Sequence, residues 1–139
     1  MSNVLTTTQT ETSEMDGVEV NNTDWETICP ISKLEPERGI AALLDGRPIA
    51  VFRIDEAGES YFYAVDHIDP KTNTPTMARG IVGSTNGSPT IAAPLLKEKY
   101  SLVTGECLSD SDLELATFAV RVQNGVLQVR RNVILGKQS

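Results

Sequence analysis

Two short loops in the middle of the 139-residue chain carry the side chains whose types and spacing bear most directly on chemistry. The first loop is Asp69-Pro70-Lys71 and the second is Ala93-Pro94-Leu95-Leu96. Paired loops can hold an iron cluster when they present thiolates and imidazoles. Here only the carboxylate has a suitable donor atom, because alanine and leucine have none and lysine would add a positive charge. We therefore expect no metal cluster and no redox centre in this chain.

The other possible ligands and nucleophiles lie outside these loops. His67 is the one histidine, and it has no evident base or nucleophile beside it, so we expect it to have no catalytic role. Cys29 and Cys107 are too few for a disulfide scaffold and are expected to be reduced core side chains. The acidic run 110–114 lacks the glycine and spacing of a calcium loop. No glycine-rich phosphate loop occurs either, so we expect no bound NAD(P)H.

Composition narrows the class of protein further. The formal net charge is -7, and four of the 19 acidic residues lie in residues 1–23, which contain no Lys or Arg. An acidic chain is a poor general nucleic-acid binder, because phosphate contact needs a basic surface. No apolar run approaches the roughly 20 residues that span a bilayer, and no signal peptide opens the sequence. We expect a cytoplasmic protein that binds neither nucleic acid nor membrane.

Short apolar segments separated by turn residues continue from Trp25 to Arg131, which predicts an all-β domain. Asp45-Gly46 and Asn124-Gly125 predict two-residue hairpin turns, and Trp25 is expected to anchor the core. The expected strands lie at about residues 25–29, 39–44, 49–54, 61–65, 90–93, 99–102, 118–122 and 126–130.

The chain divides into three expected parts. Residues 1–23 are rich in Thr, Ser, Asn and Glu, and we expect a disordered acidic tail. Residues 24–131 form the folded domain, and residues 132–139 form a C-terminal tail. Within the domain, residues 66–108 have weak periodicity and four prolines, which predicts a loop-rich subdomain. Long loops in a compact domain are usually functional, so we expect the function there.

The order of motifs in residues 24–131 resembles the Rieske ferredoxin domain. That family has Cys-Pro-His in one loop, Cys-Pro-x-His in a second, an Arg-Gly-x-Val-Gly link between them and a Thr-Gly turn after them. Pro70, Pro94, residues 79–83 and Thr104-Gly105 match this framework. The resemblance implies an antiparallel β-sandwich or barrel with a small loop-rich subdomain that binds the cluster in other members. The four ligand positions fall on Asp69, Lys71, Ala93 and Leu96.

Three segments are similar to a ligand-free branch of this family, the small subunit of the cytoplasmic NAD(P)H-dependent nitrite reductase. They are residues 65–70, 77–82 and 93–97. The resemblance implies a subunit of an oxidoreductase of nitrate assimilation that reduces nitrite to ammonium. It also implies a large partner subunit that carries FAD, siroheme and a 4Fe-4S cluster. This chain would dock on that subunit, bind no cofactor and contribute no catalytic residue.

The tips of the two loops are the expected docking site. The candidate residues are Asp69, Lys71, Met77, Arg79, Leu95, Leu96 and Lys97. Leu95 and Leu96 beside Lys97 give an apolar centre with a charged rim, as interfaces commonly have. Equally, the two leucines could fill the space of the lost cluster, because an empty apolar cavity costs stability.

Two other functions stay open on the sequence alone. One is a ferredoxin component of a different oxidoreductase, such as an oxygenase. The other is a free-standing Rieske-like binding module with another partner. The sequence also leaves open how a small subunit would aid catalysis, the stoichiometry and the choice between NADH and NADPH.

Overall fold

The computed structural model describes the backbone of residues 24–134 and the side chains of residues 24–131. Within this part the chain is all-β, as predicted, with two short 3-10 helices, η3 (Ile31–Lys33) and η4 (Met77–Arg79). One sheet has the strand order β1-β9-β8-β4-β3-β2, and a second has the order β5-β6-β7. The strands are β1 (Trp25–Pro30), β2 (Gly39–Leu44), β3 (Arg47–Glu56), β4 (Glu59–Asp66), β5 (Ile81–Thr85), β6 (Ser88–Ala92), β7 (Lys99–Ser101), β8 (Thr117–Gln123) and β9 (Val126–Ile134).

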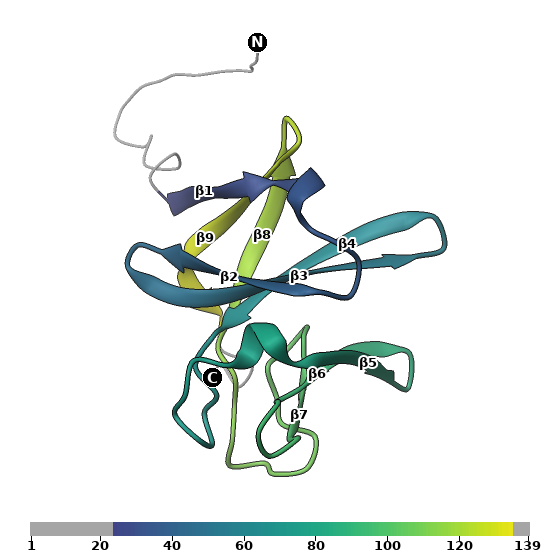
Figure 1. Cartoon of the computed structure of the whole chain (residues 1–139), viewed down its shortest axis with the longest axis vertical. Helices are drawn as coiled ribbons and strands as arrows, with labels where there is room; N and C mark the ends of the chain where they lie inside the picture. Colours follow the sequence, from purple (N-terminus) through teal and green to yellow (C-terminus); the bar gives the residue numbers. More distant parts are fainter. Residues whose placement is uncertain (1–23, 135–139) are drawn as a thin grey trace.

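The larger sheet curls into a nearly closed antiparallel barrel, seen in the upper part of Figure 1. Its outermost strands, β1 and β2, come into contact where the barrel closes. At this seam the backbone N–H of Asp45 donates to Glu26 Oε1 at 2.9 Å. Of the sandwich and the barrel, the structure is therefore the barrel. Its interior is filled by Leu34, Leu44, Ile49, Val51, Ala64, Phe118, Leu127 and Val129.

The hairpins of the barrel follow from residues that tolerate positive φ. Asp45 and Gly46 have φ of 52° and 83°, and Asn124 and Gly125 have φ of 56° and 77°. Positive φ at both central positions defines the type I′ turn, whose twist matches that of the flanking strands. Both hairpins predicted from the Asp-Gly and Asn-Gly pairs are confirmed.

A smaller lobe is inserted between β4 and β8 and lies below the barrel in Figure 1. It contains the three-stranded sheet, η4 and the loops between them. Apolar side chains join the two parts, because Phe52 and Val65 of the barrel share one buried cluster with Met77, Ile91 and other side chains of the lobe. The lobe is thus packed onto the barrel by a shared apolar cluster, which is separate from the cluster inside the barrel.

Three details differ from the sequence-based expectation. Strand β5 was not expected, and β9 continues to Ile134, past the expected domain end at 131. Trp25 is half-buried and is not a core anchor. The guanidinium carbon of Arg121 lies 4.4 Å from the centre of its ring. The expected acidic tail, residues 1–23, and residues 135–139 lie outside the described part. Within it, no helix is long and apolar enough to cross a membrane.

Candidate partner-docking site

The first loop, residues 67–76, folds around Asp69. The backbone N–H of Asp69 donates to the carbonyl of Thr74 at 2.7 Å, and its own carbonyl accepts from Asn73 N–H at 2.7 Å. Its side-chain Oδ1 accepts from the backbone N–H of Lys71 at 2.9 Å. This is an Asx turn, in which a short carboxylate substitutes for a backbone acceptor. The side chain at the first ligand position therefore holds the loop in shape.

The second loop, residues 93–98, closes on itself through Ala93. Ala93 N–H donates to the carbonyl of Glu98 at 2.8 Å, and its carbonyl accepts from Lys97 N–H at 2.9 Å. Lys97 has a φ of 62°, which turns the chain back towards β7. The tip of the loop lies between these hydrogen bonds. As a result Leu95 and Leu96 are 56% and 52% exposed.

An ion pair joins the two loops. Lys71 Nζ lies 3.2 Å from Glu98 Oε2, and Ser109 Oγ donates to Glu98 Oε1. These two partners, the serine hydroxyl first and the lysine second, hold the pKa of the Glu98 carboxyl below its usual value. Glu98 therefore connects the first loop, the second loop and the segment after β7.

The four ligand positions do not fit a 2Fe-2S cluster. Asp69 and Ala93, at the two thiolate positions, are 0% and 1% exposed. Lys71 and Leu96, at the two imidazole positions, are exposed. Methyl and isobutyl groups cannot coordinate iron, and one carboxylate cannot replace four ligands. Among the described residues, no group of three or more His, Cys, Asp or Glu side chains is placed to hold a metal ion.

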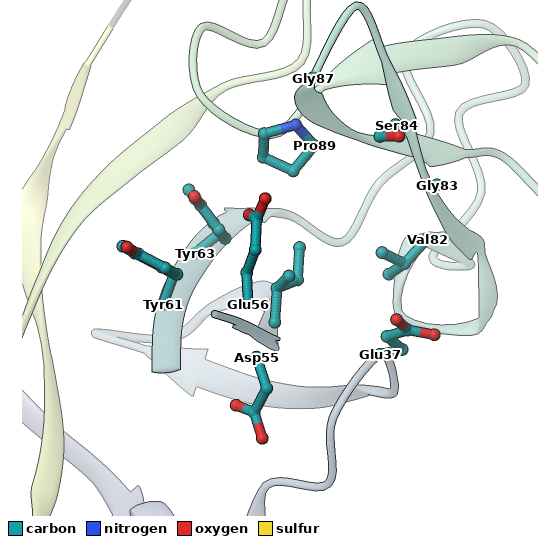
Figure 2. A pocket seen from close by; sticks show the side chains of 11 residues that line it. Glu37, Asp55, Glu56, Tyr61, Tyr63, Val82, Gly83, Ser84, Gly87 and Pro89 are labelled. Carbon is teal, nitrogen blue, oxygen red and sulfur yellow. The ribbon is translucent and has the colours of Figure 1, made fainter. Parts of the chain in front are cut away.

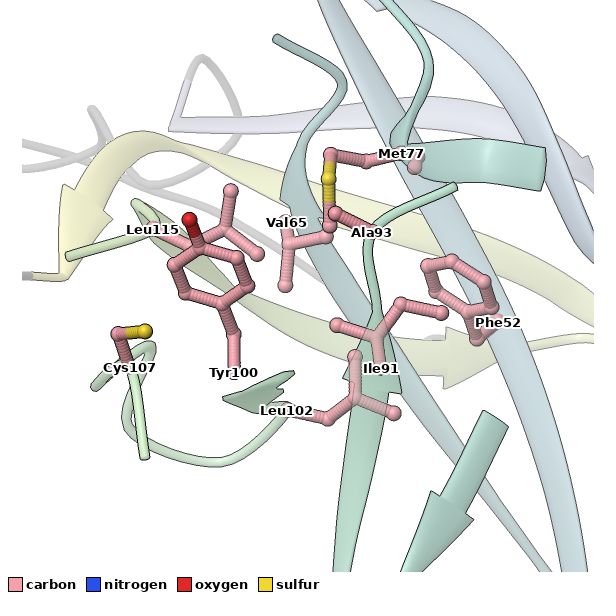
Figure 3. Close-up of a cluster of buried hydrophobic side chains, with 10 residues drawn as sticks. Phe52, Val65, Met77, Ile91, Ala93, Tyr100, Leu102, Cys107 and Leu115 are labelled. Carbon is pink, nitrogen blue, oxygen red and sulfur yellow. The ribbon is translucent and has the colours of Figure 1, made fainter. Parts of the chain in front are cut away.

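The interior behind the loops is closed by apolar packing. Figure 3 shows Tyr100, Leu102, Ile91 and Ala93 of the lobe packed in one cluster with Phe52 of the barrel. The Tyr100 side chain is fully buried, and the hydroxyl has no hydrogen-bond partner within the described residues. Burial, followed by the negative charge of Asp69, raises the pKa of this phenol. The phenol is therefore neutral at physiological pH and serves as packing.

His67 has a structural role that sequence reasoning did not assign. Its Nδ1 accepts from the backbone N–H of Ala78 at 3.1 Å, and its carbonyl accepts from Met77 N–H at 3.0 Å. Burial lowers the pKa of the imidazole; the charge of Asp66 opposes that shift, and Arg79 adds to it. The neutral ring fixes η4 against the end of β4.

Four of the seven candidate docking residues lie together on the surface. Leu95, Leu96 and Lys97 form the tip of the second loop, and the ion pair to Glu98 brings Lys71 beside it. We call these four residues, Lys71, Leu95, Leu96 and Lys97, the loop face. Because both leucines are about half exposed, they do not fill the interior behind the loops.

The other three candidates lie elsewhere. Asp69 and Met77 are fully buried, so their side chains act from inside the lobe. Arg79 is exposed but lines a cavity beside β5, together with Arg38 and Ile81. Sequence reasoning missed Glu98 as the link between the loops. The only signal in the sequence for this role of Glu98 is the alternation of charge in Lys97-Glu98-Lys99, and that alternation does not identify the partner of Glu98.

The cysteines lie outside this site. Both are free thiols, as expected, and Cys107 is buried whereas Cys29 is half-buried. Burial raises the pKa of the Cys29 thiol, which keeps it protonated. Cys107 Sγ lies 3.6 Å from Glu98 Oε1 and so packs behind the link between the loops.

Comparisons with known proteins agree with this geometry. The model of the Rieske-like [2Fe-2S] domain family matches residues 24–130. The nitrite reductase (NADH) small subunit of Escherichia coli K12 is 32% identical over 106 residues, which are 76% of this chain and 96% of that protein. The solution structure of the nitrite reductase [NAD(P)H] small subunit from Erwinia carotovora superimposes with a TM-score of 0.65 at 29% identity, covering 84% of this chain and 91% of that one.

A third relative is much longer than this chain. The nitrite reductase [NAD(P)H] large subunit of Klebsiella oxytoca contains a segment that is 28% identical over 113 residues. The segment covers 81% of this chain but only 11% of that protein. In that relative, a domain similar to this chain is part of the same polypeptide as the remainder of the large subunit.

Proposed function

Because the chain belongs to the Rieske-like [2Fe-2S] domain family and, within it, to the NADH-dependent nitrite reductase small subunits, we propose that it is the small, cluster-free subunit of such an enzyme. The assembled enzyme is an oxidoreductase that reduces nitrite to ammonium in nitrate assimilation. This chain docks on the large subunit, and the redox chemistry takes place there. We assign FAD, siroheme and a 4Fe-4S cluster to the large subunit, and the complex to the cytoplasm, where NADH is available.

One observation carries this proposal: the similar segment inside the large subunit of Klebsiella oxytoca. A domain within one polypeptide stays next to its neighbours at an effective concentration of about millimolar. A separate small subunit has no such tether. Surface contacts of its own must therefore keep it on the large subunit.

The loop face supplies such contacts. Leu95 and Leu96 form an exposed apolar centre, Lys97 adds a positive charge beside it, and the ion pair of Lys71 with Glu98 completes the polar rim. Interfaces commonly combine a desolvated apolar centre with a polar rim. We expect the matching surface of the large subunit to be apolar at its centre and acidic at its edge.

The ferredoxin alternative is disfavoured by the ligand positions. An electron-carrying Rieske domain needs two thiolates and two imidazoles. Ala93 and Leu96 provide no donor atom, so this chain cannot carry electrons through a cluster. The other alternative, a free-standing binding module, would not bind a nitrite reductase large subunit. Binding to that subunit therefore distinguishes the two.

Co-expression tests the proposed function directly. The full chain is produced with a tagged siroheme-containing nitrite reductase large subunit from the same source. We expect the chain to co-purify, and the complex to reduce nitrite with NADH faster than the large subunit alone. A large subunit that purifies without the chain and has the same activity with or without it would overturn the proposal.

A further inference from the structure

Strand β5 lies at an edge of its sheet and offers unpaired backbone groups. Within the described residues it pairs with β6 alone, in a continuous one-to-one register. The two strands are joined by a two-residue turn, Asn86-Gly87, with φ of 53° and 81°. In such a hairpin the residues next to the turn, Thr85 and Ser88, form a hydrogen-bonded pair, and bonded pairs then alternate along the ladder. The next pair, Ser84 and Pro89, is therefore not hydrogen-bonded.

The contacts of Pro89 show independently which residue pairs of the β5–β6 ladder are hydrogen-bonded. Pro89 has no N–H, and its carbonyl accepts from Leu102 N–H at 3.0 Å, on the side of β6 that faces away from β5. The backbone N–H and carbonyl groups of Ser84 and Val82 consequently point away from β6, towards the open edge. No group of the described residues hydrogen-bonds to them.

A groove runs along β5. One part of it has a volume of about 290 Å³ and is lined by Tyr61, Tyr63 and Glu56 opposite Val82 to Ser84. The other part, about 380 Å³, is lined by Arg38 and Arg79 opposite Gly80 to Val82. Both cavities are lined in part by Glu37 and Val82, so they are neighbours along β5. We call the two cavities together the β5 groove.

On the β3–β4 side of the 290 Å³ cavity, Glu56 points into the space. Figure 2 shows its carboxylate directed towards Pro89, whereas Asp55 points away. Asp55 is engaged by Arg53 at 3.0 Å. Glu56 and Glu37 form no ion pair within the described residues. The 290 Å³ cavity has no Lys or Arg among its described lining residues. The carboxylates of Glu37 and Glu56 beside two tyrosine rings therefore favour a guanidinium there, which pairs with carboxylates and stacks on aromatic faces.

The sequence of β5 lacks the usual protection of an edge strand. Natural edges carry lysine, proline or a bulge that prevents another strand from pairing. Ile81-Val82-Gly83-Ser84-Thr85 has no charge and no proline, and its register with β6 has no bulge. The two edge strands of the barrel sheet, β1 and β2, are less open than β5, because they come into contact and cover each other.

We propose that β5 receives an extended, arginine-bearing segment of the large subunit as an added strand. The segment hydrogen-bonds to Val82 and Ser84, and its arginine lies over Glu56 and Tyr63 in the β5 groove. Strand addition of this kind obtains affinity from backbone bonds and specificity from side-chain pockets. The inference rests on the proposed function and adds a second contact surface to the loop face.

Hydrogen–deuterium exchange of the full chain, alone and in complex with the large subunit, tests the strand addition. We expect the amides of Val82 and Ser84 to exchange rapidly in the free chain. In the complex their exchange rates should fall by a factor on the order of ten or more. A complex that forms while both amides exchange as fast as in the free chain would overturn this inference and leave the proposed function intact.

Two pairs of variants test the bonding groups. Ser84→Pro removes the outward N–H without breaking the ladder to β6, and Ser84→Ala keeps it. Loss of one net hydrogen bond should weaken binding about three- to tenfold in Ser84→Pro alone. Glu56→Lys should weaken binding on the order of tenfold. Glu59→Lys, in the same hairpin but outside the groove, should not change it.

The remaining outcomes are distinguishable. If the wild-type chain forms no complex at all, the proposed function fails and this inference fails with it. If the free chain instead dimerises with rising concentration and Ser84→Pro abolishes the dimer, the edge serves a second copy and the inference is overturned. Thermal melting of each variant separates weakened binding from loss of the fold.

Discussion

Lys71 and Glu98 form an ion pair of 3.2 Å between residues 27 positions apart, and they join the two loops that carry the ligand positions. In a cluster-bearing member the metal itself would link these loops. In this chain a charged pair and the hydroxyl of Ser109 perform that task. The loop face is therefore built on an electrostatic contact, which can be altered one residue at a time.

Replacing Lys71 changes the titration of Glu98. In Lys71→Met, the pKa of Glu98 should rise towards 4.5, its usual value, and remain partly lowered by Ser109. When folding lowers the pKa of a carboxyl, the carboxylate stabilises the fold at pH values above its pKa in the unfolded chain. That stabilisation is lost as the pH falls through the pKa of the folded state. The variant should therefore be less sensitive to acid below pH 4.5.

Carboxyl NMR titration measures this shift. Lys97→Met is the matched control, because Lys97 is next to Glu98 in the sequence but forms no ion pair with it. An unchanged Glu98 pKa in Lys71→Met would contradict the link between the loops.

The exposed leucines should contribute to binding of the large subunit. Leu95→Asp combined with Leu96→Asp should weaken the complex by at least about tenfold, because two half-buried apolar contacts are lost and charges are introduced. Binding is measured by calorimetry. Leu43→Asp is the control, since Leu43 is 63% exposed on β2, in the barrel rather than in the lobe. Equal binding by both variants would place the interface elsewhere.

His67 should titrate below 6.5, its usual value, because burial favours the neutral ring. The unfolded chain then binds a proton more readily than the folded one. The contribution of His67 to the free energy of unfolding should be constant above pH 6.5 and fall as the pH drops from there to the folded pKa. The single histidine can be followed directly by NMR.

A variant that keeps the hydrogen bond isolates the charge. His67→Asn retains an acceptor for Ala78 N–H and has no group that titrates. It should lose the pH dependence in this window. A folded pKa at or above 6.5 for the wild-type histidine would contradict the prediction.

Gly105 should tolerate no side chain. Its φ is 84°, and a Cβ would lie 1.9 Å from the carbonyl oxygen of Leu115. Gly105→Ala should lower the free energy of unfolding by at least about 2 kcal/mol, from backbone strain together with the clash. Gly125→Ala, with a φ of 77° and no atom within 4 Å, should cost only about 1 kcal/mol. Chemical denaturation compares the two.

Much of the barrel could be predicted because its signals are local. The Asp45-Gly46 and Asn124-Gly125 turns identify their hairpins without any tertiary information. The prediction that Trp25 anchors the core was wrong. An aromatic side chain on a strand is buried only if another part of the chain covers the sheet face on which it lies. Here the guanidinium of Arg121, from a strand almost a hundred residues later, lies over the ring, and the indole stays half-buried.

The lobe was harder to predict for a physical reason. Asn86-Gly87 carried the same turn signal as the two recognised hairpins, but β5 before it contains a glycine and two small polar residues. A strand with one open edge and an exposed face has little apolar pattern to detect. The link between Lys71 and Glu98 joins distant parts of the chain, and single-sequence charge patterns do not reveal such pairs.

The apolar cluster behind the loops has a consequence for the biosynthesis of this subunit. The lobe is closed by Tyr100, Ile91, Leu102 and their neighbours rather than by iron and sulfide. Because the described residues place no group of His, Cys, Asp or Glu side chains to hold a metal ion, we expect this lobe to fold without cluster-assembly machinery. Folding of the lobe is therefore expected to proceed under iron limitation.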